Sequence, residues 1–310
     1  MSTDRAALRR YAWLSIAAAV TTIVLKTTAW SLTGSVGLLS DALESFVNLA
    51  GAMMALAMLG IAARPADDTH AFGHSKAEYF SSGVEGTLIL LAAVSIAYAA
   101  VTRLVDPRPI EQAGLGLAVS LVASVVNLAV ALVLLRAARR NDSITLEANA
   151  HHLLTDVWTS VGVLVGVALV AVSGWQRLDP IVAIAVAANI VWAGTRIVRS
   201  SVGGLMDAAL PGEEVRAVED ALAPFMTGGV GFHALRTRQA GSRRFVSLHV
   251  LVPGSWTVQH GHDLLERIEA ALRARLPGVS VISHLEPAED PTSWDDAGLD
   301  RDSPQVPSGS

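Results

Sequence analysis

Long apolar runs separated by short polar interruptions dominate the first two thirds of the chain. A membrane-spanning helix needs about 20 mostly apolar residues. Six segments come close to this length: Ala12–Trp30, Val36–Ala62, Tyr79–Leu104, Leu115–Leu135, Leu153–Ser173 and Ile181–Val198. Turn and breaker residues such as Gly34 and Pro107 lie between them. The pattern predicts an α-helical membrane protein with six transmembrane helices.

The pattern changes after Arg199, where shorter amphipathic and alternating segments replace the apolar runs. They predict, in order, a helix, two strands joined as a hairpin, a second helix and a third strand: Glu213–Phe225, Phe232–Gln239, Arg244–Val252, Val258–Leu276 and Val279–His284. This αββαβ order is typical of a small two-layer α+β domain.

Four parts of the chain follow from these patterns. Residues 1–11 form a short polar segment, 12–206 the six-helix domain, 207–288 the α+β domain, and 289–310 an acidic tail that we expect to be disordered. The first apolar run is too long for a secretory signal and carries Lys26, so we interpret it as a retained helix.

Composition agrees with a membrane protein. Of 310 residues, 52% are hydrophobic and only 16% charged, and the mean hydropathy is +0.45. The net charge of −5 gives a nucleic-acid partner no electrostatic support. The chain has no cysteine, which excludes disulfides and thiolate metal sites, so any transition metal must be held by imidazole and carboxylate groups.

Basic residues near the span ends predict the orientation. With both termini inside, the outer side carries only Arg103, Arg108 and Arg177, whereas the inner side carries many more. Because positive charge is retained in cytoplasmic loops, both termini should be cytoplasmic in a bacterial inner membrane.

Two pairs of polar residues interrupt the second and fifth apolar runs. Glu44 and Asn48 are four residues apart, as are His152 and Asp156, which places each pair on one face of a helix. Polar groups at membrane depth usually face a partner, an ion or a water-filled cavity. The two pairs predict a four-ligand cation site between two membrane helices, with a hydrogen-bonded cluster as the alternative.

Two neighbouring polar residues have weaker assignments. Asp41 lies one turn before Glu44, where it lines the external mouth of the pathway or serves the start of its helix. His151 projects about 100° away from His152 around the helix and is the poorer ligand candidate.

Further candidate ligands lie outside the apolar runs. The loop after the second span contains Asp67, Asp68, His70 and His74, enough for a local metal site, although such a cluster can also be an ordinary polar loop. The α+β domain contributes a larger set, of which His260 is best interpreted as a surface histidine: His233, His249, His260, His262, His284 and Glu286.

Four arginines surround the predicted hairpin: Arg236, Arg238, Arg243 and Arg244. They could form a phosphate-binding or anionic-lipid patch. We prefer the interpretation of a solvated rim with charge pairs.

In combination these motifs are specific, and the chain resembles the cation diffusion facilitator family, in particular the bacterial zinc/iron exporters, over roughly residues 10–287. The resemblance rests on Lys26, the Gly34-Ser35-Val36 turn, His152 with Asp156, and three longer stretches: 65–78, His233–Arg238 and His284–Pro287.

The resemblance implies a homodimer with six membrane helices per chain and a cytoplasmic metallochaperone-like domain, exchanging divalent metal for protons. It implies no enzyme activity and no cofactor; the metal is substrate and regulatory ligand. The implied transport site is Glu44, Asn48, His152 and Asp156, and the loop site Asp67, His70 and His74. The implied dimer-interface cluster is His233, His249, His262, His284 and Glu286. Lys76 and Asp207 match a charge pair that joins the membrane and cytoplasmic parts at the dimer contact.

Glu44 and Asn48 depart from the pattern of the zinc-type members, which usually have His or Asp at the first position and Asp at the second. Asn48 is the departure that matters. The amide cannot ionise, so the site has one carboxylate fewer. The function expected is export of Zn²⁺, or of Fe²⁺, Co²⁺, Cd²⁺ or Ni²⁺, by alternating access. A transport-impaired metal-sensing scaffold or partner subunit is the alternative. An intramembrane metallohydrolase is disfavoured because the chain has no His-Glu-x-x-His motif.

Overall fold

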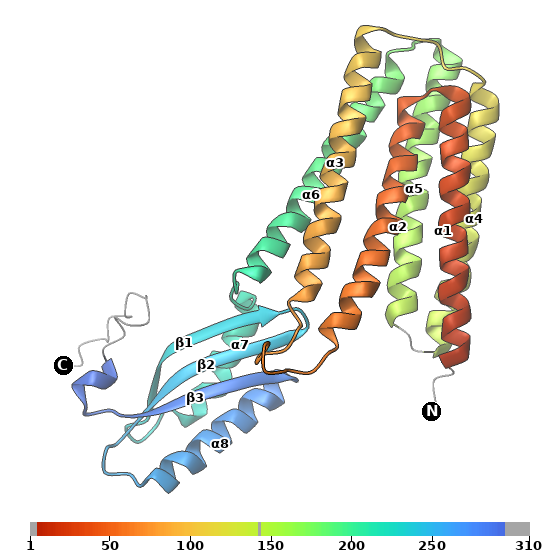
Figure 1. The fold of residues 1–310 in the computed structure, drawn as a ribbon. Coiled ribbons are helices and arrows are strands. Elements are labelled where there is room, and N and C mark those ends of the chain that lie inside the picture. The colour runs from red at the N-terminus through yellow and green to blue at the C-terminus, as the bar shows by residue number, and fades with distance from the viewer. Residues whose placement is uncertain (1–4, 142–143, 295–310) are drawn as a thin grey trace. The chain divides into compact units, whose positions relative to one another are not determined.

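The computed structural model describes residues 5–141 and 144–294 and divides the chain into two compact units. The first consists of residues 1–57 and 81–199, and the second of residues 58–80 and 200–310. The helices and strands of both units are labelled in Figure 1.

Six long helices carry the apolar runs: α1 (Arg5–Thr33), α2 (Val36–Ala62), α3 (Ala77–Val105), α4 (Ala113–Asn141), α5 (Ile144–Ser173) and α6 (Leu178–Leu205). In the described part of the chain, all six are long and apolar enough to cross a membrane. The prediction of six spanning helices is therefore confirmed. Several helices extend beyond the predicted spans, because helix continues into polar flanking residues that hydropathy leaves out. α5, for example, begins at Ile144 rather than near Leu153.

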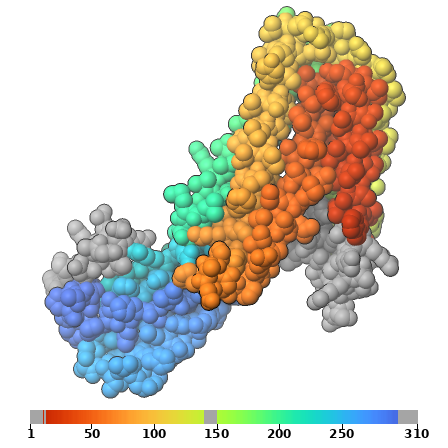
Figure 2. All heavy atoms as spheres, in the orientation of Figure 1, coloured from red at the N-terminus to blue at the C-terminus, as the bar shows by residue number. Residues whose placement is uncertain are grey.

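Within the first unit, two groups of helices pack through small and branched side chains. In one group Ala18 of α1, Leu134 of α4 and Leu153 of α5 are buried together, and Figure 1 shows these three helices side by side. In the other, Ile96 of α3 packs with Ala187 of α6 and with the start of α2. In Figure 2, α1, in red, lies at the surface of this unit beside α2, in orange.

The N-terminus of α2 is capped by a side chain from another helix. Asp179, in the first turn of α6, accepts hydrogen bonds from the hydroxyl of Ser35 (2.6 Å) and from the backbone N–H groups of Val36 (2.8 Å) and Gly37 (3.1 Å). A Cβ atom at Gly37 would lie 3.2 Å from the Asp179 carboxylate, so the absence of a side chain permits this approach. The first backbone N–H groups of a helix lack hydrogen-bond partners within the helix, and the buried Asp179 carboxylate is their acceptor here.

The second unit contains the predicted αββαβ domain: α7 (Gly212–Leu222), a 3₁₀ turn (Ala223–Phe225), β1 (Gly231–Ala240), β2 (Arg243–Val252), α8 (Val258–Arg275) and β3 (Val279–Pro287). The sheet order is β1-β2-β3, with β1 antiparallel and β3 parallel to β2. The core lies between the helices and one face of the sheet, where Leu248 of β2 meets Val218 of α7 and Ile268 of α8. The α+β fold class is confirmed.

Two details differ from the sequence expectation. β3 continues to Pro287, so Glu286 lies within the strand rather than after it. Residues 289–294, expected to belong to a disordered tail, include a 3₁₀ turn at Pro291–Trp294. The remainder of the predicted tail lies outside the described residues. The exact boundaries of the predicted domains stay a prediction.

Candidate functional site

The intramembrane site of α2 and α5 is partly assembled. Asn48 Nδ2 donates a hydrogen bond of 3.1 Å to Asp156 Oδ1, which joins the two helices. Asp156 is buried, Glu44 is half-buried and His152 is exposed. Glu44, His152 and Asp156 are not among the described groups whose ligand atoms all lie within 4.8 Å of one another. The structure thus brings Asn48 and Asp156 together, but not the three ionisable ligands as one compact set.

A buried ion pair lies in the same unit and was missed by sequence reasoning. Lys26 Nζ donates to Asp41 Oδ1 and to the hydroxyl of Ser45, both at 2.8 Å. The Ser160 hydroxyl donates to the same Asp41 oxygen at 2.7 Å. Lys26 and Asp41 are 1% and 2% exposed, so neither of the two roles expected for Asp41 describes this arrangement.

The network joins α1, α2 and α5 at one level of the bundle. Lys26 is the sequence feature that could have predicted this ion pair, because a lone cation in an apolar run requires a counter-ion.

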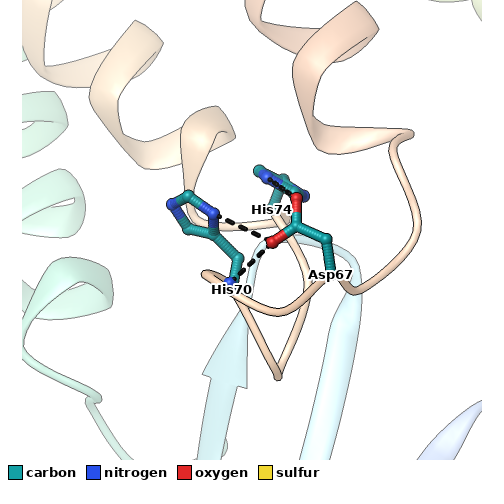
Figure 3. A group of neighbouring side chains, drawn as sticks. All are labelled: Asp67, His70 and His74. Atoms are coloured by element: carbon teal, nitrogen blue, oxygen red, sulfur yellow. Dashed lines mark hydrogen bonds and ion pairs between the residues drawn. The ribbon is translucent and has the colours of Figure 1, made fainter.

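The loop cluster lies between α2 and α3 and is shown in Figure 3. Asp67 Oδ1 is 3.4 Å from His70 Nδ1, and Asp67 Oδ2 is 3.4 Å from His74 Nε2. The two imidazole rings have centroids 4.3 Å apart. The Thr69 hydroxyl and the backbone N–H of His70 donate to Asp67 and lower the pKa of its carboxyl to about 2. An ionised carboxylate flanked by two imidazoles is a suitable ligand set for a divalent metal.

The third cluster lies on the sheet, and strand register explains how it forms. His233 of β1 is opposite His249 of β2, which is opposite His284 of β3. Residues opposite one another point to the same face, and Glu286 shares the face of His284 because side chains alternate along a strand. Ala234, with a φ of +50°, lies in the β-bulge that follows His233.

Glu286 is the centre of this row of side chains. Its Oε2 is 2.8 Å from His233 Nε2, and its Oε1 is 3.2 Å from His249 Nδ1. His284 Nδ1 is 3.5 Å from the same Oε1, but its side chain is 65% exposed. His233, His249 and Glu286 offer ligand atoms that all lie within 4.8 Å of one another.

His262 is exposed on α8 and does not belong to this group. α8 packs on Val246, Leu248 and Val250 of β2, the face opposite to that of His249. Within one chain, the predicted histidines therefore lie on two sides of the sheet: His233, His249 and His284 on one face, and His262 beyond the other.

A tryptophan covers the third cluster and has no counterpart in the sequence predictions. The Trp294 indole stacks on the His233 imidazole, with centroids 5.8 Å apart and an interplanar angle of 25°. Its Nε1 donates to the Ala288 carbonyl at 2.9 Å, and the Ser293 hydroxyl donates to the Pro287 carbonyl at 2.8 Å. These bonds fold the segment after β3 back over the end of the sheet.

The charge pair predicted by resemblance is present and has a third member. Lys76 Nζ is 3.0 Å from Asp207 Oδ1, and Arg238 donates to that oxygen at 2.9 Å. Partial burial raises the pKa of Asp207, but hydrogen bonds from Arg238 and Lys76 outweigh this and hold it below its usual value. Asp207 has a φ of +58°, in the left-handed region that directs the chain out of α6.

These features define a polytopic membrane protein with several candidate metal centres, and sequence comparisons identify its family. Residues 12–206 match the cation efflux transmembrane domain, and residues 210–288 match the cytoplasmic domain of cation efflux proteins. The chain belongs to the cation efflux (cation diffusion facilitator) family, which confirms the resemblance. The family is one of transporters rather than enzymes.

Individual relatives cover nearly the whole chain. It is 54% identical over 303 residues to the uncharacterised transporter sll1263 of Synechocystis sp., covering 96% of this chain and 98% of that protein. It is 32% identical over 265 residues to the cation-efflux pump FieF of Citrobacter koseri, covering 86% and 88% of the two chains. The metal-bound C-terminal domain of the CzcD transporter from Thermotoga maritima is 24% identical, with a TM-score of 0.24; the match covers 25% of this chain and 91% of that one.

Proposed function

We propose that the protein exports a divalent metal ion from the cytoplasm in exchange for protons, by alternating access. The observation that supports this most directly is the contact between Asn48 and Asp156, which joins α2 and α5 within their candidate membrane spans. Glu44 lies one turn from Asn48, and His152 one turn from Asp156. Because the chain belongs to the cation efflux family, a metal cation is the expected substrate of such a site.

The exchange depends on competition between metal and protons for the same ligands. Metal enters from the cytoplasm when Glu44, His152 and Asp156 are deprotonated, and the bundle then rocks to expose the site on the other side. Protonation of His152 and Asp156 displaces the metal, and the protonated site returns. Asn48 now donates its N–H to Asp156, so metal binding requires its amide to turn and present its oxygen.

Zn²⁺ is the cargo that this ligand set favours. One imidazole, two carboxylates and one amide oxygen suit tetrahedral coordination, and two carboxylates balance a divalent charge. The imidazole disfavours a site for a purely oxygen-liganded metal, while Fe²⁺, Co²⁺, Ni²⁺ and Cd²⁺ remain candidates for transport.

The sheet cluster would sense cytoplasmic metal in a homodimer. His233, His249 and Glu286 can share one ion, with His284 beside them. His262 lies on the other side of the same sheet, so it would join a cluster only through a second copy of the chain. Metal that links two copies shifts the transporter toward one state by its differential affinity for the two states. We propose a metal-binding role for Asp67, His70 and His74 as well.

The membrane placement completes the proposal: six spans in a bacterial inner membrane, with both termini in the cytoplasm. It is supported by the excess of basic residues at one set of span ends.

Transport by purified protein in liposomes tests the proposal. With a panel of divalent metals inside and a pH-sensitive dye, the wild type should show metal efflux coupled to proton entry. Asp156→Ala should abolish both fluxes, whereas Asp106→Asn, at an exposed carboxylate outside the site, should leave both unchanged. Metal flux that persists in Asp156→Ala would refute the assigned site.

Asn48→Asp tests the role of the amide. An added carboxylate should strengthen metal binding or raise the number of protons exchanged per metal, and steepen the dependence of transport on pH. Unchanged affinity and pH dependence would contradict this role.

A second candidate function is a transport-impaired scaffold or partner subunit that senses metal. The Asn48 amide at a ligand position favours it, because an amide can bind but cannot carry a proton. Metal binding without any metal-dependent proton flux, for every metal in the panel, would select this function over transport.

A further inference from the structure

Residues 289–294, here called the terminal segment, continue the chain beyond the part that matches the family's cytoplasmic domain, which ends at residue 288. The terminal segment closes with the 3₁₀ turn Pro291–Trp294, where the sequence predicted disorder. The metal-sensing role proposed above does not yet include any of these residues. Their contacts lead from the ends of two strands to one of the candidate metal ligands.

Hydrogen bonds attach the terminal segment to the sheet. The backbone N–H of Gly254, two residues after β2, donates to Glu289 Oε2 at 2.8 Å. The Ser293 hydroxyl donates to the carbonyl of Pro287, the last residue of β3, at 2.8 Å. Ser293 is only 5% exposed, so this bond is shielded from water. The ends of β2 and β3 therefore hold the terminal segment at a fixed place beside the sheet.

Trp294 carries this order to the candidate metal ligands. Its Nε1 donates to the Ala288 carbonyl at 2.9 Å, which limits rotation of the indole. The indole stacks on the His233 imidazole with centroids 5.8 Å apart and 25° between the planes, the geometry of an offset aromatic stack. His233 Nε2 and Glu286 Oε2 are hydrogen-bonded at 2.8 Å. The imidazole is thus held at its face by the indole and at Nε2 by the carboxylate.

The ligand atoms beside this stack suit a metal ion. His249 Nδ1 is buried and forms no hydrogen bond with any described residue, although it lies 3.2 Å from Glu286 Oε1. A buried nitrogen without a hydrogen-bond partner costs free energy, which a bound cation would recover. Imidazole nitrogens and a carboxylate are suitable ligands for Zn²⁺ and similar ions. The side chains of His233 and Glu286 are only 9% and 13% exposed, so packing around them determines their orientation.

We propose that Trp294 is a positioning residue for a metal ion held by His233, His249 and Glu286. The proposal rests on the metal-binding role proposed above for these ligands. The indole fixes the plane of the His233 imidazole before the ion arrives, so that binding does not have to order this side chain. Removing a group that orients a metal ligand typically lowers metal affinity by about 10–100-fold.

Titration of the full-length protein in detergent with Co²⁺ tests the role of the indole, because the visible absorption of Co²⁺ reports its coordination. Asp67→Ala and Asp156→Ala form the background, so that the loop and intramembrane sites do not contribute. In this background Trp294→Ala should weaken Co²⁺ binding about tenfold and alter the absorption per bound ion, because the imidazole is no longer held in place. Trp294→Phe keeps an aromatic face and should recover most of the affinity. Trp175→Ala, at an exposed tryptophan of the first unit, is the control and should change neither quantity.

Two shortened chains test the terminal segment as a whole. A chain that ends at Ala288 lacks Trp294 and its supporting hydrogen bonds, and should bind Co²⁺ at least as weakly as Trp294→Ala. A chain that ends at Trp294 lacks only residues 295–310 and should bind Co²⁺ as the full-length background does. Circular dichroism and size-exclusion chromatography verify the fold and the oligomeric state of each protein.

Several outcomes would overturn the proposal. Unchanged affinity in both Trp294→Ala and the chain ending at Ala288, with binding abolished by His233→Ala, would refute the role of Trp294 and leave the metal site in place. A loss of affinity seen only together with unfolding or loss of a dimer would show that Trp294 acts on stability or assembly. An equal loss in the chain ending at Trp294 would assign the effect to later residues. Co²⁺ binding that His233→Ala does not change would refute the metal-sensing role itself, and this proposal with it.

Discussion

The buried ion pair between Lys26 and Asp41 predicts a large loss of stability when either charge is removed alone. The Nζ–Oδ1 distance is 2.8 Å, and both side chains are 1% exposed. At an effective dielectric constant of about 20, two unit charges at this distance attract by about 6 kcal/mol. Removing one partner leaves the other charged and buried, which typically costs about 3–5 kcal/mol. Asp41→Asn and Lys26→Met should each destabilise the bundle by this amount.

The double variant distinguishes ion pairing from simple packing. Lys26→Met with Asp41→Leu removes both charges together, so its free energy of unfolding should return to within about 2 kcal/mol of the wild type. Asp106→Asn is the control, because the Asp106–Arg108 pair has side chains 68% and 69% exposed and should contribute at most about 1 kcal/mol.

Thermal unfolding in detergent, followed by circular dichroism at fixed protein and detergent concentration, measures these effects. A loss of 3–5 kcal/mol corresponds to a fall in Tm of about 6–20 °C. Single variants with a wild-type Tm would refute the buried pair. A double variant as unstable as the worse single variant would show that packing, and not charge, determines the cost.

Three further predictions concern particular contacts. Co²⁺ binding at the sheet cluster should quench Trp294 emission; the quenching should disappear in Trp294→Phe and persist in Trp256→Phe, whose indole contacts His260 instead. Asp179→Asn should lower the free energy of unfolding by about 1–3 kcal/mol, measured as above, because the cap of α2 loses a charged acceptor. The hydrogen bond from Arg244 lowers the pKa of Glu214, so the pair stabilises the fold above the unfolded pKa of about 4.3, and this contribution is lost as pH falls through the folded pKa. Arg244→Met should therefore flatten the decline of unfolding free energy between about pH 5 and 3, and an unchanged profile would contradict the pairing.

The hydrophobic pattern predicted the elements well because each element depends on local periodicity. Six runs of apolar residues gave six helices, and alternation in Arg244–Val252 gave a strand whose inward side chains form the core. The same alternation places His249 on the outer face, but it does not specify which strands lie beside it. That depends on the β1-β2-β3 order, which brings Glu286 to His233 across the sheet.

Long-range partners were harder to predict because sequence spacing carries no information about them. Asp41 could be placed on a helix face, yet its pairing with Lys26 depends on how α1 packs beside α2 and α5. The prediction of a rim with charge pairs for the hairpin arginines agrees with the ion pairs Arg238–Asp207 and Arg244–Glu214. It did not include the contact of Arg238 with two aromatic rings, which forms because loop residue Phe72 packs onto the sheet.

The carboxylate at the start of α6 that holds the first residues of α2 also constrains how the bundle can move. Three hydrogen bonds to one buried group fix the two helix ends to each other. In the proposed alternating access, a tilt of α2 that opens the far end of the transport pathway would pivot near these hydrogen bonds and carry the beginning of α6 with it. Displacement should therefore grow with distance from the pivot, so that residues near Asn48 travel farther than those near Val36.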